Sequence, residues 1–473
     1  MNEQQPPNFA HDLLNRFIRP EFLEPTLGDL EERFEEDITQ YGLGKAKRKY
    51  IKNAIGFMRP GLMKKIGGTQ KLNAFGMLKH HIKLSFRSFK RFKTSFAINL
   101  IGLSSGLACT LLIYLWVSDE WNMDKFHAHE DYLYQVKQNI NIIDKIETID
   151  PTPAYLGQAL LEEFASVERM TSVVPIGSYG SDGVIERGEK QFKALEQYAT
   201  SDYFEVFSFP LKIGDKSIVL ESKENIVISQ SLSDNLFGEG VDPRGESINW
   251  LSEGETYTYL VSGVFEPLPG NTSEYFDVVF HLETFLDRYP HIRDWGNSDP
   301  STYIVLSEDA SPADFHAQIK DFLLTKKEDY PHTLLLQKYS DTYLYGKYQN
   351  GLPLPGRMQY VRLFAFIAGL VLIIACINFM NLSTARASRR LKEIGVKKAM
   401  GVSRNALVVQ FFTETFLLTF ISIVLAFLLV SGVLTPFNHL VGKELVLDLN
   451  YELLTFSFAI LIGTTILSGS YPA

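Results

Sequence analysis

Few stretches of this 473-residue chain carry residue types at a spacing that suggests chemistry. His127, His129 and Glu130 in "FHAHED" bring together imidazole and carboxylate groups, which are metal ligands. No third ligand has a convincing spacing, so an ordinary polar turn is favoured over a metal site. The sequence contains no GxxxxGK[ST] phosphate loop, no GxGxxG after a strand and no HExxH motif. We therefore expect a non-catalytic protein with no metal, no bound cofactor and no nucleic-acid partner.

A second candidate is the basic run "STARASRRLKEIGVKKAMGVSRN", residues 383–405, which lies between two very apolar stretches. It holds seven Lys and Arg residues and one acid, Glu393. Apolar residues alternate with the charges, and the i, i+4 spacing of Glu393 and Lys397 favours a helix. Positive charge alone would suit a simple membrane-proximal anchor. The regular apolar stripe within it indicates a shaped docking surface instead.

Glycines divide the basic run into parts. We expect Gly395 and Gly401 to interrupt the helix with sharp backbone turns, because glycine is a poor helix former. Ser403 has the residue type and position to cap the N-terminus of the helix that follows.

Four apolar runs are long enough to cross a hydrocarbon layer of about 30 Å, which takes about 20 helical residues. The sequence therefore predicts an α-helical membrane protein with four transmembrane helices. The two cysteines, Cys109 and Cys376, both fall within these runs, so no disulfide framework is expected outside them. The expected spans are 94–117, 361–382, 411–433 and 453–472.

Charge around the spans predicts their orientation. Residues 79–93 carry six Lys and Arg residues and no acid, which by the positive-inside rule places the N-terminus in the cytoplasm. The segment 118–360 would then lie outside, and it holds 40 Asp and Glu residues and 19 Lys and Arg residues, a net formal charge of −21. The second span returns the chain, which puts the basic run 383–405 on the cytoplasmic side.

Two folded parts flank the first span. Residues 118–360 read as a large mixed α/β extracytoplasmic domain, with strand-like runs at 224–229, 257–265, 275–280 and 301–307. Helical periodicity in the same segment favours helices over 154–170 and 313–327. Residues 1–75 read as a small helical cytoplasmic N-terminal domain, either an interaction or regulatory module or a set of plain solvated helices.

A few polar and small residues lie within the expected spans. Gly102 and Gly106 form a GxxxG pattern that lets helices approach closely, although single occurrences also arise by chance. Asn378 and Asn381 near the cytoplasmic end of the second span, and Glu414 in the third, either hydrogen-bond between helices or sit at the interface without a special role.

Residues 375–415, which contain the basic run, resemble the signature of the FtsX-like permease domain of MacB-type ABC transporters. The motif (K/R)-E-I-G-x-(K/R)-(K/R)-x-x-G of that family matches "KEIGVKKAMG" from Lys392 to Gly401. Residues 84–136 are similar to the family's first span and the start of its periplasmic core domain. The N-terminal region resembles a short permease prefix domain, so the resemblance extends over nearly the whole chain.

The resemblance implies a permease subunit of an ABC transporter in the bacterial inner membrane. In such systems ATP is bound and hydrolysed by a partner ABC-type ATPase, and the movement is transmitted to the extracytoplasmic domain for export or mechanotransmission. The coupling positions that the family motif assigns on this chain are Glu393, Ile394, Gly395, Lys398 and Gly401. The permease would act as a dimer, or as half of a pseudo-dimer.

One departure concerns the C-terminus. The family usually continues beyond "GSYPA", so we expect the natural chain to extend past Ala473. The alternative function is a membrane-anchored sensor or adaptor whose external domain binds a ligand while the basic run engages another cytoplasmic partner. A membrane-bound enzyme acting outside is the least favoured class.

Overall fold

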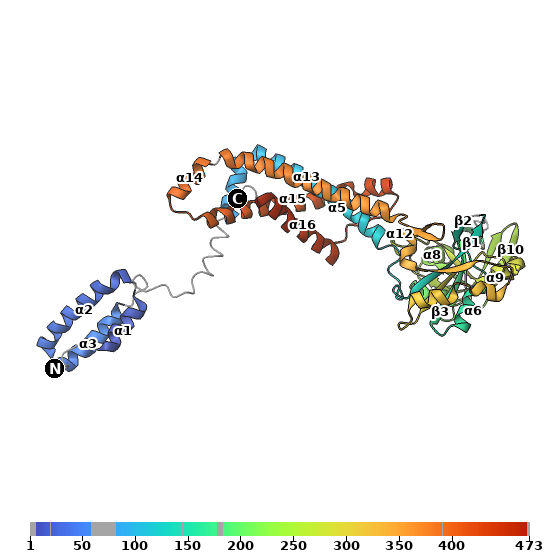
Figure 1. Cartoon of the computed structure of the whole chain (residues 1–473), viewed down its shortest axis with the longest axis horizontal. Helices are drawn as coiled ribbons and strands as arrows, with labels where there is room; N and C mark the ends of the chain where they lie inside the picture. The colour runs from blue at the N-terminus through green and yellow to red at the C-terminus, as the bar shows by residue number, and fades with distance from the viewer. Residues whose placement is uncertain are drawn as a thin grey trace. The chain divides into compact units, whose positions relative to one another are not determined.

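The computed structural model divides into two units, each described here by itself (Figure 1). One unit holds Met1–Phe96 and Lys392–Leu417, and the other holds Ala97–Leu391 and Leu418–Pro472. The structure describes residues 6–18, 20–57, 82–143, 145–176, 183–389 and 391–470.

Three helices pack together near the N-terminus: α1 (Asn8–Phe17), α2 (Pro20–Tyr41) and α3 (Leu43–Gly56). Leu30 and Phe34 from α2 are buried, and the Phe34 ring meets the edge of the Tyr50 ring at 5.3 Å between centroids. The helix α2 begins at Pro20, and Pro is tolerated at a first helical position because the N–H that it lacks would have no partner within the helix. Gly42, with φ +80°, makes the turn into α3.

Four described helices are long and apolar enough to cross a membrane. At about 1.5 Å per residue, the longest of them extends well beyond a hydrocarbon layer of about 30 Å. The longest helix therefore contains a membrane span and an extension beyond it. The four described helices are α5 (Lys93–Trp121), α13 (Met358–Arg389), α15 (Arg404–Val441) and α16 (Tyr451–Ser470).

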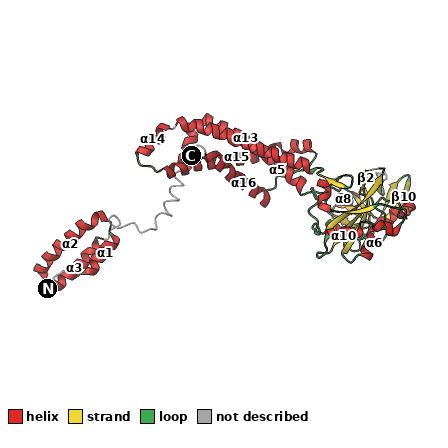
Figure 2. Cartoon of the chain, in the orientation of Figure 1, coloured by secondary structure: helices red, strands yellow, loops and turns green. Residues whose placement is uncertain are grey.

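The segment between α5 and α13 folds around a mixed β-sheet with helices packed on it (Figure 2). Its strand order among the described residues is β13-β1-β12-β3-β6-β11-β8-β10-β9-β4-β5, with β2 added to β1 and β7 added to β10. The pairs β8–β10 and β6–β11 are parallel, and the other pairs are antiparallel. The prediction of a mixed α/β domain is confirmed.

The strands of this sheet are β1 (Leu133–Ile142), β2 (Lys145–Ile149), β3 (Val167–Val174), β4 (Gly183–Arg187), β5 (Lys190–Ala194), β6 (Glu196–Ala199), β7 (Leu211–Ile213), β8 (Asn225–Ser229), β9 (Ser247–Ser252), β10 (Glu255–Phe265), β11 (Val278–His281), β12 (Ser301–Leu306) and β13 (Thr333–Lys338). A separate hairpin pairs β14 (Lys347–Gln349) with β15 (Leu352–Leu354). The helices are α6 (Leu156–Glu163), α7 (Tyr203–Val206), α8 (Gln230–Phe237), α9 (Leu282–Arg288), η1 (Pro290–Arg293), α10 (Pro312–Ile319), α11 (Phe322–Lys326) and α12 (Tyr339–Tyr345).

The expected strands all occur, whereas both expected helices differ from the prediction. The helix expected over 154–170 ends at Glu163, and Val167 starts the buried strand β3. Most of β3 is buried in the sheet, and this tertiary burial outweighs the helical periodicity. The helix expected over 313–327 is divided into α10 and α11 around Lys320 and Asp321.

Candidate functional site

The basic run forms a short helix, α14 (Leu391–Ala399), followed by a turn into α15. The helix continues through Gly395, so the predicted turn at that residue is wrong. A single glycine costs a helix only about 1 kcal/mol, and a Cβ built on Gly395 would meet nothing within 4 Å. Gly395 therefore leaves an open spot on the helix surface rather than a break in the backbone.

The predicted turn at Gly401 is confirmed. Gly401 has φ +86°, a left-handed conformation that glycine adopts without strain, and its N–H donates to the Lys398 carbonyl at 3.0 Å. Ser403 then caps α15, because its hydroxyl accepts a hydrogen bond from the Ala406 N–H at 3.4 Å. The turn fixes where the chain leaves α14 and enters the long helix α15.

The surface of α14 combines apolar and cationic groups. Val396 and Met400 are 57% and 71% exposed, and Lys398 is also exposed. Ile394 is partly buried, and Lys397 Nζ donates to Gln410 Oε1 of α15 at 3.3 Å. The side chain of Glu393 lies outside the described residues. An exposed apolar strip bordered by cations has the composition of a protein docking surface.

A contact between α5 and α13 accounts for the GxxxG pattern. A Cβ on Gly106 would lie 2.6 Å from the Ala375 Cβ, and a Cβ on Gly102 would lie 3.3 Å from Asn378 Nδ2. The two helices thus approach so closely that Gly106 leaves no room for a larger residue. Asn381 is exposed, and the described contacts do not bring it to this interface.

Glu414 joins α15 to the helical segment that precedes α5. Ser88 Oγ donates to Glu414 Oε1 at 2.8 Å. Of the two alternatives for Glu414, the hydrogen bond between helices is therefore the one observed. Such a bond fixes the register of the two helices near the membrane boundary.

The residues considered for metal binding make other contacts. His127 is buried, with its ring packed against the rings of Phe126, Phe207 and Phe209. Burial lowers the pKa of His127 to about 4, so the ring is neutral at physiological pH. Glu130 pairs with Lys338 at 3.1 Å. Within the described residues, no group of three His, Cys, Asp or Glu side chains is placed to hold a metal.

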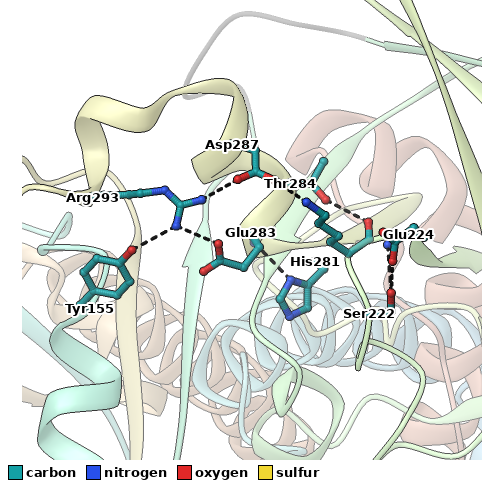
Figure 3. A network of polar contacts seen from close by, with 9 residues as sticks. Tyr155, Ser222, Glu224, His281, Glu283, Thr284, Asp287 and Arg293 are labelled. Carbon is teal, nitrogen blue, oxygen red and sulfur yellow. Dashed lines mark hydrogen bonds and ion pairs between the residues drawn. The ribbon is translucent and has the colours of Figure 1, made fainter.

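A polar network on the mixed α/β domain between α5 and α13 was not foreseen from the sequence. Arg293 Nη1 donates to Tyr155 Oη at 3.1 Å and to Glu283 Oε2 at 2.9 Å, while Nη2 reaches Asp287 Oδ1 at 2.7 Å (Figure 3). Lys223 pairs with the other Asp287 oxygen at 2.9 Å. The network thereby ties α9 to α6 and to the segment before β8. Because its charges come from separate segments, no local pattern could have revealed it.

A pocket of about 550 Å³ opens beside this network. Lys223 and Asp287 belong to both, and the Arg288 guanidinium lies 4.7 Å from the Tyr257 ring centre in the same pocket. Its other lining residues are Glu224, Thr256, Thr258, Tyr259 and Thr284. Polar and aromatic side chains of this kind suit a small ligand. The charged groups Lys223, Asp287 and Glu224, however, already pair or hydrogen-bond within the protein.

Comparisons with known proteins identify the two parts of the chain. The MacB-like periplasmic core domain family matches residues 96–322, and the FtsX-like permease C-terminal family matches residues 365–473. A domain of a permease protein from Porphyromonas gingivalis is similar in structure, with a TM-score of 0.39 and 18% identity. That similarity covers 50% of this chain and 98% of the other.

Among relatives in sequence, the uncharacterized ABC transporter permease YvrN of Bacillus subtilis is 23% identical over 397 residues, covering 75% of this chain and 86% of YvrN. The macrolide export ATP-binding/permease protein MacB of Bdellovibrio bacteriovorus is 33% identical over 111 residues, which is 24% of this chain and 17% of that protein. MacB of Agrobacterium fabrum is 24% identical over 349 residues, and this chain spans 47% of its length. The chain thus spans less than half of the MacB relatives that it matches.

The domain matches agree with the apolar helices and the mixed α/β domain between the first two of them. The protein is a multi-pass membrane protein of the bacterial inner membrane and the permease component of an ABC transporter. The chain belongs to the MacB/FtsX-like family of ABC transporter permeases.

Proposed function

We propose that this permease couples ATP hydrolysis by a separate ABC-type ATPase to movement of its external domain, for export or mechanotransmission. The observation that carries this proposal is the surface of α14, where Val396 and Met400 are exposed beside Lys398. Export names on two groups of relatives, for macrolides and for pyoverdine, support transport as the outcome. The ATP-binding function belongs to the partner subunit.

The coupling residues divide by role. Ile394 supplies apolar contact and Lys398 supplies positive charge, while Gly395 leaves room for a partner backbone to approach. The Gly401 turn connects α14 directly to α15, so a push on α14 is delivered to a span. Glu393, the second residue of the family motif, is proposed as a further contact with the ATPase.

The test is co-purification with a candidate ABC-type ATPase. Gly395→Trp is expected to abolish the complex, because the side chain would fill the open spot on α14 without a clash inside the permease. Gly28→Trp on α2 is the matched control, since a Cβ there also meets nothing within 4 Å. Complex formation by Gly395→Trp at the wild-type level would refute the docking role and favour a sensor or adaptor.

The proposed orientation places the N-terminus and α14 in the cytoplasm and residues 118–360 outside. We expect a cysteine at Ile218, which is 55% exposed, to react with an impermeant thiol reagent in intact cells. A cysteine at Met400 is expected to react only after the membrane is opened. Both measurements use a background in which Cys109 and Cys376 are replaced. The reverse pattern of labelling would overturn the topology.

A dimeric or pseudo-dimeric assembly fits the exposure of α13. Only 11% of the most apolar segment of α13 is buried within the chain, compared with 44% of the corresponding segment of α16. The exposed side of α13 is therefore available to lipid or to a second permease half. We propose the second permease half as its partner in the transporter.

A further inference from the structure

A cluster of charged groups lies where the spans meet the external domain. Lys443, in the connection between α15 and α16, forms ion pairs with Asp119 and with Glu120 Oε1, the latter at 2.6 Å. The two carboxylates belong to the last turn of α5, and the side chain of Glu120 is 3% exposed. The lysine thus links the third and fourth spans to the end of the first.

The same carboxylate continues the link into the external domain. Tyr343 Oη, on α12, donates to Glu120 Oε1 at 3.1 Å, and Arg357 Nη1, just before α13, donates to Tyr343 Oη at 2.8 Å. The Arg357 guanidinium also lies 4.5 Å from the Tyr343 ring centre. Glu120 therefore has partners from both the external domain and the α15–α16 connection.

Two kinds of contact hold this junction, namely apolar packing and ion pairs. Trp116 and Val117 of α5 pack with Leu344 of α12 and with Met358 and Val361 of α13 in one apolar cluster. Such packing holds α5, α12 and α13 together as a unit. Lys443 instead joins its connection to this unit through largely buried ion pairs, which hold the connection to the unit when the helices shift, because breaking them would leave buried charges unpaired.

A pocket beside the cluster leaves room for such a shift. It has a volume of about 380 Å³ and is bounded by Asn271 of the external domain, Asp119 of α5, and Glu444 and Asp448 of the connection. The connection therefore does not pack tightly against the loop at Asn271, and the Lys443 ion pairs hold it to the end of α5 instead.

We propose that Lys443, Asp119, Glu120 and Tyr343 form a polar lock that transmits movement of α15 and α16 to the external domain. This inference deepens the proposed function and assigns positioning roles to residues far from the ATPase-coupling helix. The locked arrangement keeps the connection in register with α12. Loss of the lock leaves the spans and the external domain intact but lets them move independently.

The first test needs no ATPase. Spin labels at Ile218 of the external domain and Leu449 of the connection, both exposed, are placed on the full chain in lipid nanodiscs, in a background without Cys109 and Cys376. Lys443→Met is expected to broaden the distribution of distances between the two labels relative to wild type. Lys223→Met, which removes the exposed ion pair with Asp287, is the matched control and is expected to change nothing.

Two further variants separate a broken lock from a damaged fold. Lys443→Arg keeps a cation beside Asp119 and Glu120, so it is expected to retain the narrow distribution. Tyr343→Phe keeps the aromatic packing but loses the hydrogen bonds to Glu120 and Arg357, so it is expected to broaden the distribution partially. A wild-type distribution in both Lys443→Met and Tyr343→Phe would overturn the lock.

The second test uses the complex with the ATPase. The ATP-dependent change in the same distance is expected to fall about fivefold or more in Lys443→Met, while ATPase binding stays at the wild-type level. A full ATP-dependent change in that variant would overturn the coupling role. Failure of the ATPase to bind the wild-type chain would instead refute the proposed function, and the first test would still decide whether the lock exists.

Discussion

Replacing Glu274 by Gln is expected to remove a loss of stability that the wild-type protein undergoes as pH rises from about 4.5 to about 7. Burial, with a smaller contribution from the nearby Asp124, raises the pKa of the Glu274 carboxyl to about 7. Burial also raises the pKa of Asp124, although a hydrogen bond from the Ser273 N–H at 2.7 Å opposes that rise. Two carboxyl groups thus share a site that favours their neutral forms.

The direction of the pH effect follows from the protons bound in each state. The folded protein keeps the Glu274 proton up to about pH 7, whereas the unfolded chain releases it near the ordinary value of 4.5. Between these values the folded state binds more protons, so the free energy of unfolding falls as pH rises and levels off above about pH 7. The shift corresponds to a loss of up to about 3 kcal/mol at 1.36 kcal/mol per unit.

The measurement is hydrogen exchange of the external sheet in the full chain between pH 4.5 and 8, corrected for the intrinsic exchange rate. Glu274→Gln is expected to flatten the pH dependence of the opening free energy and to be more stable than wild type at pH 8. Glu266→Gln, at an exposed position after β10, is the control and should keep the wild-type slope. An unchanged slope in Glu274→Gln would show that this carboxyl is not the titrating group.

Glu274 also lies in a loop of the mixed α/β domain that contacts the segment after α5. Asp124 N donates to the Asn271 carbonyl at 2.8 Å, and Asn271 Nδ2 donates to the Asn122 carbonyl at 2.8 Å. The loop that carries Glu274 is therefore bonded to the segment that follows the first span.

The spans and several strands could be predicted because each depends on local sequence. Apolar runs of about 20 residues identify the four long helices, and the β-branched run that became β12 identifies a strand without reference to neighbours. The short signals at Ser403 and Gly401 also sufficed, since a cap and a left-handed turn need only the right residue at one position.

Prediction failed where distant segments decide the outcome. The end of α6 at Glu163 depends on β3 being drawn into the sheet between β12 and β6. At His127 an ordinary polar turn was favoured over a metal site, but the aromatic rings that pack around the side chain were not predicted. Lys443 is the one cationic residue of the described loop 442–450. Its carboxylate partners lie more than three hundred residues earlier in the sequence, so no spacing rule could connect them.

The α5–α13 contact gives the second large effect, because Gly106 is the position with least room. Gly106→Leu is expected to reduce the stability of the membrane domain by about 1–3 kcal/mol, the usual cost of overpacking. The new Cβ would lie 2.6 Å from the Ala375 Cβ, which cannot rotate away as the end of a flexible side chain would. The helices must therefore separate, which also shifts α5 relative to α12 and the external domain.

Thermal unfolding of the purified chain in detergent measures this effect, with Gly432→Leu as the matched control. Gly432 lies in α15, is exposed, and has nothing within 4 Å of a built Cβ. The control adds the same apolar volume to a span without touching a neighbouring helix, so its midpoint should stay near the wild-type value. Equal midpoints for Gly106→Leu and Gly432→Leu would mean that α5 and α13 do not meet closely at Gly106. A lower midpoint for Gly106→Leu that returns toward wild type when Ala375 is also replaced by Gly would identify the α5–α13 contact as the cause, because the second change removes the atom in the way.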